Sequence, residues 1–219
     1  MNNSAIRDNN ILCLVSVFNE FRSENKYCDA RLRVGGELFY SQRFVLAAAS
    51  EYFDAMFDGN FKERNVEQVE PIELHDVDAT AFKEIVEFIY TGDITVTDSN
   101  VCNLLQASDF LQLRNPYVKN QCVRFVVNSV ERTEQPLQNA FDIFSLAVGT
   151  NNGILVDTLS KHICVHLKHF SMDAKFLEIS FDELLLILSR KQVFRCSENS
   201  FLSTILRWVD YFREERKKY

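Results

Sequence analysis

The chain has 219 residues, with 24 Lys and Arg against 31 Asp and Glu, and a formal net charge of −7. This acidic balance argues against a nucleic-acid-binding face, which needs clustered basic residues, and an apolar content of 47% excludes a largely disordered chain. With only 6 Gly and 3 Pro, the chain is expected to make few tight turns and to be mostly helical.

The cysteines and the N-terminus bear on the cellular compartment in which the protein is expected. The 6 cysteines are scattered and include no C-x-x-C pair, and the first residues lack the basic and apolar segments of a signal peptide. No apolar run approaches the length of a membrane span. We therefore expect an intracellular protein with free thiols.

The first half of the chain predicts helices around a short hairpin. Apolar residues between 11 and 21 recur at the spacing of one face of an amphipathic helix. Residues 30–34 alternate apolar and basic side chains, as in a half-buried strand, and Gly35-Gly36 predicts a two-residue hairpin turn. Strands are predicted over residues 30–34, 37–40, 69–74 and 94–96.

Capping residues predict where the helices of this half begin and end. Ser41 and Ser50 are expected to cap two short helices, and Thr97 or Asp98 a third. The apolar spacing over residues 78–92 predicts a helix that a glycine ends.

Past Val130 the sequence predicts only helices. A polar stretch over residues 131–136 is a plausible seam between two modules. Helices are then predicted over residues 137–148 and 154–170, after the capping box Ser180-x-x-Glu183, and over 201–213. The predicted fold class is α+β and mostly helical, with a mixed first half and an all-helical second half.

No catalytic or cofactor-binding motif is present in the sequence. It lacks the phosphate-binding loop, the dinucleotide-binding glycine pattern and the nucleophile elbow. His162, His166 and His169 share one stripe of a helix, but they flank an apolar stripe, and no pair of cysteines supplies further zinc ligands. We therefore predict no enzyme activity, no metal site and no cofactor.

An ordered set of motifs resembles a BTB (POZ) domain followed by the BACK domain of Kelch-like proteins. The BTB-like motifs are Tyr27-Cys28-Asp29, Phe39, Val45 to Ser50, Tyr52-Phe53, Met56-Phe57, Phe82, Phe88 to Gly92, Val101, Leu104-Leu105, Ala107 and Phe110 to Leu113. The looser BACK-like matches are Asn139, Phe144, Ala147, Phe176-Leu177 and Trp208-Val209. The resemblance implies a BTB domain over residues 10–128, with a small sheet flanked by helices, and part of an all-α BACK domain over 129–219.

Two features depart from the pattern that this resemblance implies. Gln42 stands where the family usually has histidine, a change between polar residues that should leave the fold intact. The sequence stops at Tyr219, in what looks like the middle of a BACK domain, and it holds no Kelch propeller. The resemblance therefore implies a truncated BACK domain and a substrate-binding region that is missing.

The resemblance implies a homodimer built on the first helix. An apolar stripe at the start of the chain needs cover, which a second copy would supply, although packing on its own domain is the alternative. Asp29 and Arg43 are expected to place opposite charges in a pocket at this interface, or else to form an exposed pair of little consequence. The expected dimer-interface residues are Leu12, Leu14, Val15, Phe18, Asp29 and Arg43.

The resemblance also implies binding to the N-terminal domain of cullin-3. Phe61-Lys62-Glu63 has the hydrophobic-x-Glu pattern of such adaptors, in which the apolar side chain anchors and the carboxylate accepts a hydrogen bond at the rim. The expected cullin-binding residues are Tyr52, Met56, Asn60, Phe61, Glu63, Phe141 and Phe144. For Phe141 and Phe144, helical spacing makes core packing an equal alternative.

The predicted function is that of a dimeric substrate adaptor of a cullin-3 ubiquitin ligase. An unknown protein substrate would bind the missing Kelch-type region, and neither nucleic acid nor a membrane is expected as a partner. The alternative is a homodimerising cytoskeletal or transcriptional scaffold that does not engage a cullin. The cytoplasm is the expected compartment, with the nucleus as a second one.

Overall fold

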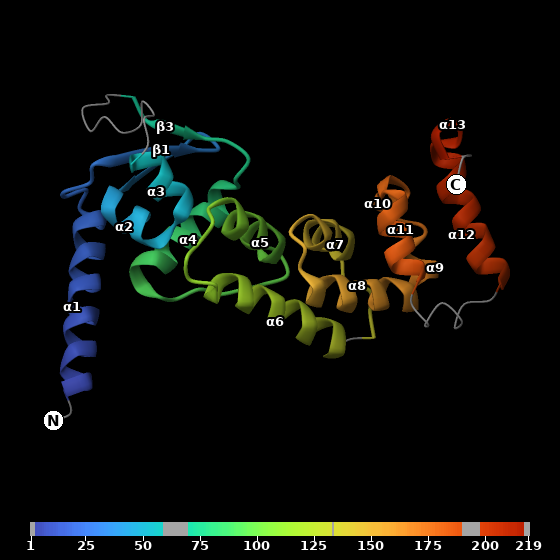
Figure 1. Ribbon diagram of the computed structural model, residues 1–219, viewed down its shortest axis with the longest axis horizontal. Helices are drawn as coiled ribbons and strands as arrows, with labels where there is room; N and C mark the ends of the chain where they lie inside the picture. Colours follow the sequence, from blue (N-terminus) through green and yellow to red (C-terminus); the bar gives the residue numbers. More distant parts are fainter. Residues whose placement is uncertain (1–2, 59–69, 133, 190–197, 217–219) are drawn as a thin grey trace. The chain divides into compact units, whose positions relative to one another are not determined.

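The computed structural model describes residues 3–58, 70–132, 134–189 and 198–216 (Figure 1). Its contacts divide the chain into two compact units, Met1–Cys122 and Val123–Tyr219, which are described separately. The first unit combines helices with a small sheet, and the described part of the second is helical. The predicted α+β, mostly helical class is confirmed.

The sheet of the first unit has three strands in the order β2-β1-β3. The central strand β1 (Ala30–Val34) pairs antiparallel with β2 (Glu37–Ser41) and parallel with β3 (Ile72–Leu74). Gly35 and Gly36 have φ angles of 55° and 88°, the left-handed values that a tight hairpin turn requires and that glycine adopts without strain. The predicted hairpin is confirmed.

One face of this sheet forms the core with the helices beneath it. Alternate residues of β1 are fully buried, as the sequence pattern predicts. Below them, α3 (Glu51–Asp58) and α4 (Ala79–Thr91) contribute Phe53 and Phe82, both fully buried. Phe39 of β2 packs edge-on against Phe82, with ring centroids 5.0 Å apart.

The predicted strand at residues 94–96 is wrong. This segment of the structure runs as irregular chain between α4 and α5 (Val101–Phe110). A strand exists only where a neighbouring strand supplies its ladder of hydrogen bonds, and within the described chain the sheet consists of β1, β2 and β3. The apolar alternation alone could not reveal this.

Two helix caps differ from those predicted. Helix α2 (Arg43–Ala49) has Gln42 at its N-cap, whereas the Ser41 hydroxyl lies 2.7 Å from the Tyr90 hydroxyl. Asn100, rather than Thr97 or Asp98, is the N-cap of α5, and its side chain accepts a hydrogen bond from the Thr97 N–H at 2.7 Å. Neither Gln42 nor Asn100 makes a side-chain capping hydrogen bond to its own helix, and the Arg43 N–H at the start of α2 donates to the Asp29 carboxylate instead.

Other predicted caps are confirmed. The Ser50 hydroxyl accepts from the Phe53 N–H at 3.1 Å at the start of α3. Gly92 ends α4 in the left-handed conformation, as predicted, and Asp78, which was not predicted as a cap, accepts from the Ala81 N–H at 2.9 Å. Gly59, which the sequence predicts as the stop of the helix that Ser50 begins, lies outside the described residues.

The longest helix, α1 (Asn3–Ser23), begins the chain and projects from the body of the first unit (Figure 1). It contacts α4, and the Phe18 ring meets the Phe44 ring of α2 edge-on at 5.4 Å. At the other end of this unit, α6 (Tyr117–Arg132) crosses the boundary between the two units.

In the second unit the structure describes seven helices after α6. They are α7 (Ala140–Gly149), α8 (Gly153–Val165), α9 (Leu167–Phe170), α10 (Ala174–Glu178), α11 (Phe181–Leu188), α12 (Glu198–Tyr211) and α13 (Arg213–Arg216). Helix α8 packs against α7 and α11, while α12 packs against α9 and α10. The Ser180–Glu183 capping box at the start of α11 is confirmed.

The single helix predicted over residues 154–170 is divided at His166, where φ is −100° and ψ is 22°. The sequence could not show this break because Ile163, Leu167 and Phe170 remain buried on both sides of it. The apolar spacing therefore continues through the turn.

Trp208 forms the centre of the second unit's C-terminal part. It is buried, and its indole N–H donates to the carbonyl of Ile179 at 3.0 Å. The Arg216 guanidinium lies 3.8 Å from the centroid of the Trp208 ring and donates to the Trp208 carbonyl at 2.6 Å. These contacts join α12 and α13 to the end of α10.

Candidate interaction surface

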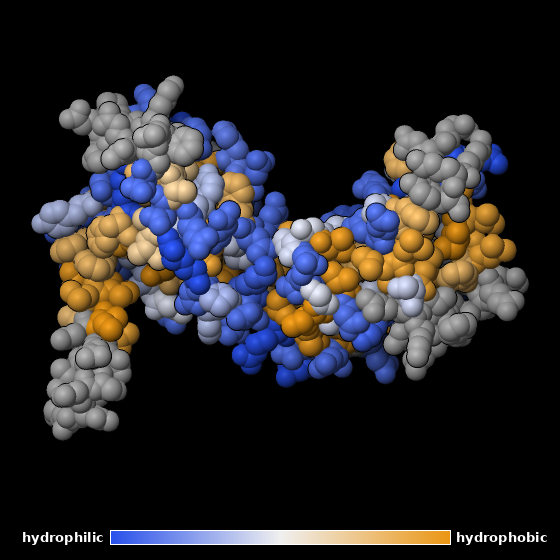
Figure 2. Space-filling view, in the orientation of Figure 1, coloured by the Kyte–Doolittle hydropathy of each residue, from blue (hydrophilic) through white to orange (hydrophobic). Residues whose placement is uncertain are grey.

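An exposed apolar surface follows α1 to its junction with α2. We call it the α1–α2 patch, and it comprises Ile11, Leu12, Leu14 and Phe44, with exposed fractions of 54%, 67%, 56% and 59%. Figure 2 shows apolar residues gathered along the described part of α1 and where it meets the body. Exposed apolar groups that are clustered in this way mark interaction sites more often than isolated ones do.

The predicted dimer-interface residues of α1 lie on or next to this patch. Leu12 and Leu14 are exposed, whereas Val15 and Phe18 are half-buried. Sequence reasoning missed Phe44. No local signal singles it out, because α2 is apolar at nearly every position, and only the structure shows that Leu46 is buried and Phe44 exposed.

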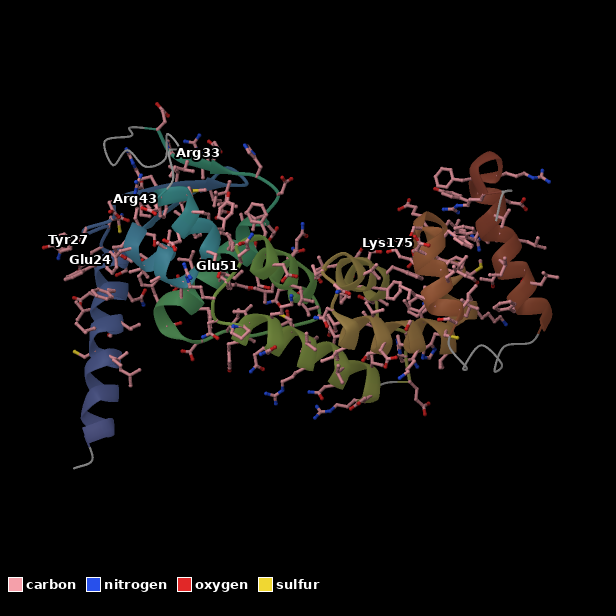
Figure 3. All side chains as sticks on the ribbon, in the orientation of Figure 1. Glu24, Tyr27, Arg33, Arg43, Glu51 and Lys175 are labelled. Atoms are coloured by element: carbon pink, nitrogen blue, oxygen red, sulfur yellow. The ribbon has the colours of Figure 1, made fainter. Side chains whose placement is uncertain are left out.

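The contacts between Asp29 and Arg43 involve the backbone. The Asp29 carboxylate accepts from the backbone N–H of Arg43 at 2.7 Å, and Arg43 Nε donates to the Asp29 carbonyl at 3.1 Å. The Arg43 guanidinium also lies 4.9 Å from the centroid of the Phe57 ring (Figure 3). In the single chain Asp29 is exposed, and its carboxylate accepts a hydrogen bond from a backbone N–H that has no partner within α2, at the start of that helix.

The predicted cullin-binding residues of the first unit fall on and after α3. Tyr52 and Met56 are half-buried on this helix, and the Tyr52 ring packs on Phe110 at 5.0 Å. Glu51 (Figure 3) and Asp54 are exposed on the same helix, where Asp54 pairs with Arg114. The other three predicted residues, Asn60, Phe61 and Glu63, lie outside the described part of the chain.

Phe141 and Phe144 belong to the core of the second unit, so the structure does not support them as contact residues. Phe144 is fully buried and Phe141 is 3% exposed. The Phe141 ring meets those of Phe170 and Phe176 at 5.3 and 6.1 Å. Both side chains lie on the buried face of α7, so neither can contact a partner unless this helix is unpacked from the core. Of the two alternatives, the structure supports core packing.

A buried polar network surrounds Gln42, the residue that departs from the family pattern. The Tyr90 hydroxyl accepts from the Gln42 backbone N–H at 3.2 Å and donates to Gln42 Oε1. Because a phenol has one proton, the Ser41 hydroxyl must donate to the Tyr90 oxygen, 2.7 Å away. Burial raises the pKa of Tyr90, so the phenol stays protonated.

The three histidines lie together in the second unit around Phe170. The rings of His162 and His166 are 4.7 Å apart, and His162 Nε2 accepts from the Leu137 N–H at 3.1 Å. Burial, with a smaller effect from His166, lowers the pKa of His162 to about 4. His162 is therefore a neutral core acceptor. Among the described residues, no three His, Cys, Asp or Glu side chains are grouped as metal ligands.

Comparisons with known proteins identify the family. The BTB/POZ domain family matches residues 18–130, and the family described as "BTB And C-terminal Kelch" (BACK) matches residues 140–219. This chain therefore belongs to the BTB-BACK, Kelch-like family. No helix in the described part of the chain is both long and apolar enough to cross a membrane.

Similar curated proteins carry Kelch-related names. Human Kelch-like protein 3 is 29% identical over 203 residues, which are 93% of this chain and 33% of that protein. Human Kelch repeat and BTB domain-containing protein 3 is 28% identical over 218 residues, 100% of this chain and 34% of that protein. The chain spans about a third of the length of these relatives.

Among solved structures, the BTB domain of zebrafish PATZ1 is similar. It is 29% identical, has a TM-score of 0.48, and covers 55% of this chain and 94% of the PATZ1 chain.

Proposed function

We propose that this chain is the BTB-BACK part of a dimeric substrate adaptor for a cullin-3 ubiquitin ligase. The observation that carries the proposal is the order of the two families, BTB over residues 18–130 and BACK over residues 140–219, in a chain similar to Kelch-like proteins over nearly its whole length. In this function the adaptor is not itself an enzyme. Other subunits transfer ubiquitin, and a Kelch-type region outside these 219 residues selects the substrate.

The α1–α2 patch supports self-association. A two-fold dimer buries the same surface on both copies, so one apolar patch is enough to make both sides of the interface. Ile11, Leu14 and Phe18 follow one another at spacings of three and four residues and lead to Phe44 at the junction with the body. Dimerisation places two cullin arms and two substrate sites in one assembly and raises their effective concentration.

Helix α3 and the segment after it support cullin binding. Met56 gives this surface a half-buried apolar side chain, and Glu51 adds an exposed carboxylate. Phe61 and Glu63 follow in sequence. A buried apolar anchor with a charged rim is a common arrangement in protein interfaces. We propose Tyr52, Met56, Asn60, Phe61 and Glu63 as the contact residues. The cytoplasm is the proposed compartment, and the nucleus is the second.

The test is calorimetric binding of the purified cullin-3 N-terminal domain to this chain. Met56→Ala and Glu63→Ala are each expected to weaken binding about tenfold or more, the effect of losing a hot-spot contact. Met172→Ala in the second unit and Glu70→Ala are matched controls, because both residues are exposed outside the proposed surface.

Two outcomes would contradict the proposal. Absence of binding, or binding that neither Met56→Ala nor Glu63→Ala weakens, would favour a BTB-BACK scaffold that dimerises without a cullin. Equal loss in the Met172→Ala and Glu70→Ala controls would show that the effect is not specific to this surface.

A further inference from the structure

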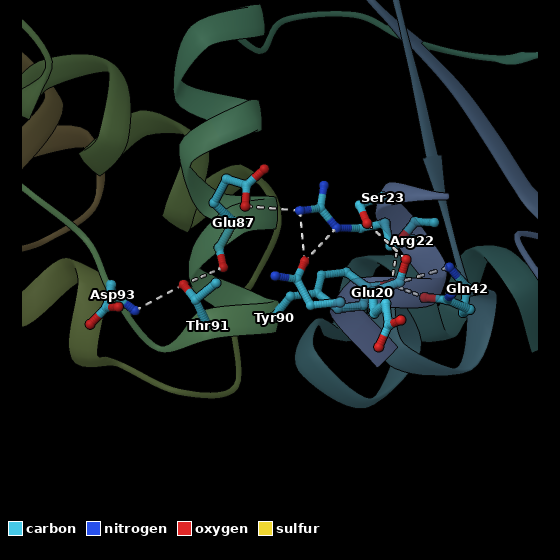
Figure 4. Close-up of polar contacts among 10 residues, drawn as sticks. Glu20, Arg22, Ser23, Gln42, Glu87, Tyr90, Thr91 and Asp93 are labelled. Carbon is cyan, nitrogen blue, oxygen red and sulfur yellow. Dashed lines mark hydrogen bonds and ion pairs between the residues drawn. The ribbon is translucent and has the colours of Figure 1, made fainter. Parts of the chain in front are cut away.

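Arg22, in the last turn of α1, joins this helix to α4 through several directed contacts. Its Nη2 donates to Glu87 Oε2 at 2.8 Å and to Asn19 Oδ1 at 2.9 Å, and its Nε reaches the same Asn19 oxygen at 3.2 Å (Figure 4). The guanidinium carbon lies 4.9 Å from the centroid of the Tyr90 ring. We call these four residues the Arg22 clamp.

The Arg22 clamp is partly shielded from water and rests on a fixed ring. The Arg22 side chain is only 17% exposed, so its contacts are screened less than those of a surface pair. The Tyr90 ring cannot shift easily, because its hydroxyl is held by Ser41 and by the main chain and side chain of Gln42. The Gln42 amide in turn donates to the carbonyl of Lys26, just after α1, at 3.3 Å.

A second contact anchors α1 on a different element. Phe18 lies four residues before Arg22, so the two side chains share one side of the helix. Phe18 meets Phe44 of α2, whereas Arg22 binds Glu87 of α4. A single contact leaves a helix free to pivot about it, and two contacts on different elements fix its direction.

The direction of α1 matters because the patch residues on this helix, Ile11, Leu12 and Leu14, lie beyond its anchors Phe18 and Arg22. Leu12 is ten residues before Arg22, or about 15 Å along the helix axis at 1.5 Å per residue. A tilt of about 10° at the base would therefore displace Leu12 by roughly 2–3 Å. Such a shift is enough to spoil close packing against a second copy.

We propose that Arg22 is a positioning residue that sets the angle at which α1 presents the α1–α2 patch to a second copy of this chain. The inference rests on the dimer proposed above and adds what holds its interface in place. Arg22 needs no contact with the partner in this role. It acts through Glu87, Asn19 and Tyr90 of its own chain.

The test is sedimentation equilibrium of the whole chain and of Arg22→Gln. Loss of a charged hydrogen-bonded group is expected to weaken the dimer about tenfold or more. Arg33→Gln (Arg33 is labelled in Figure 3) is the matched control, because it removes the same charge from the Arg33–Glu73 pair between β1 and β3. The side chains of this pair are 39% and 47% exposed. It should change the dissociation constant by less than about twofold. Arg22→Lys, which keeps the charge but loses the planar fork, should recover part of the affinity.

Hydrogen exchange separates positioning from general destabilisation. In Arg22→Gln the backbone amides of α1 should exchange faster, while those in the buried part of α4 keep their wild-type protection. If Arg22→Gln also lowers the protection of α4 amides, Glu87→Gln is the deciding variant. It removes the same ion pair by changing Glu87, whose side chain is 43% exposed, and leaves the more buried Arg22 in place. A weaker Glu87→Gln dimer with intact α4 protection would support the inference, and a wild-type dimer would overturn it.

The outcomes also distinguish this inference from the proposed function. A wild-type chain that is monomeric at micromolar concentration would refute the dimer, and the inference with it. A dimeric wild-type chain that Arg22→Gln leaves unchanged would overturn the inference alone. Equal weakening in Arg33→Gln would also overturn it, because the effect would then follow from net charge.

Discussion

Replacing Tyr90 by Phe tests the buried network that joins α2 to α4. The substitution keeps the ring and removes one oxygen, which makes hydrogen bonds with the Gln42 N–H, Gln42 Oε1 and the Ser41 hydroxyl. All three groups are buried, since Ser41 is 1% and Gln42 2% exposed. An unsatisfied buried polar group costs about 1–3 kcal/mol. At the lower end of this range, three such groups would reduce the free energy of unfolding by about 3 kcal/mol.

The assay for Tyr90→Phe must report on the first unit. The only Trp of the chain, Trp208, lies in the second unit, so its fluorescence does not follow the unfolding of α4. Hydrogen exchange of α4 amides in increasing urea measures the first unit directly, at one fixed protein concentration, because association would otherwise shift the apparent stability. The urea dependence of Trp208 fluorescence should stay unchanged.

Tyr117→Phe is the matched control for Tyr90→Phe. Tyr117 is 45% exposed and its ring stacks on Phe88 at 5.7 Å, a contact that the control keeps. It should change stability by less than about 0.5 kcal/mol. If Tyr90→Phe costs no more than this control, the reasoning from buried hydrogen bonds is refuted.

Two further predictions concern the second unit and the patch. The pKa of His162 is lowered to about 4 in the folded chain, compared with about 6.5 in the unfolded chain. The neutral ring therefore contributes fully to the stability of the fold above pH 6.5, and this contribution is lost as the pH falls towards 4. The free energy of unfolding measured by Trp208 fluorescence should therefore drop by up to about 3 kcal/mol over this range. His162→Gln, whose side chain can still accept from the Leu137 N–H, should remove this part of the drop in stability. The control His75→Gln, at an exposed position, should leave the drop unchanged. If the pH profiles of His162→Gln and the wild type are equal, His162 is excluded as the cause. Leu12→Ser should weaken the dimer by more than about tenfold, since each copy loses buried apolar area. Leu202→Ser, 58% exposed on α12, should not weaken it, and sedimentation showing equal effects would remove the patch from the interface.

The candidate site was only partly predictable from the sequence. The spacing of Leu12 and Leu14 placed them on one helix, and the structure leaves both exposed. The structure brings Asp29 and Arg43 together through bonds between a side chain and the backbone, and their place at a dimer interface stays a prediction. For Phe141 the sequence leaves a contact residue and core packing open, and the structure buries it. Helical spacing shows which residues share a face, but it does not show whether that face meets solvent or another helix.

The sequence by itself determined the elements whose signals are local. The Gly35-Gly36 hairpin, the end of α4 at Gly92 and the capping box of α11 each depend on a few adjacent residues, and all three are confirmed. Tertiary structure decided the contacts between distant segments. Arg22 and Glu87 are separated by 65 positions, and Ser41 and Tyr90 by 49. Whether such side chains meet depends on how whole helices pack, because a local pattern specifies the face of an element and not its neighbour.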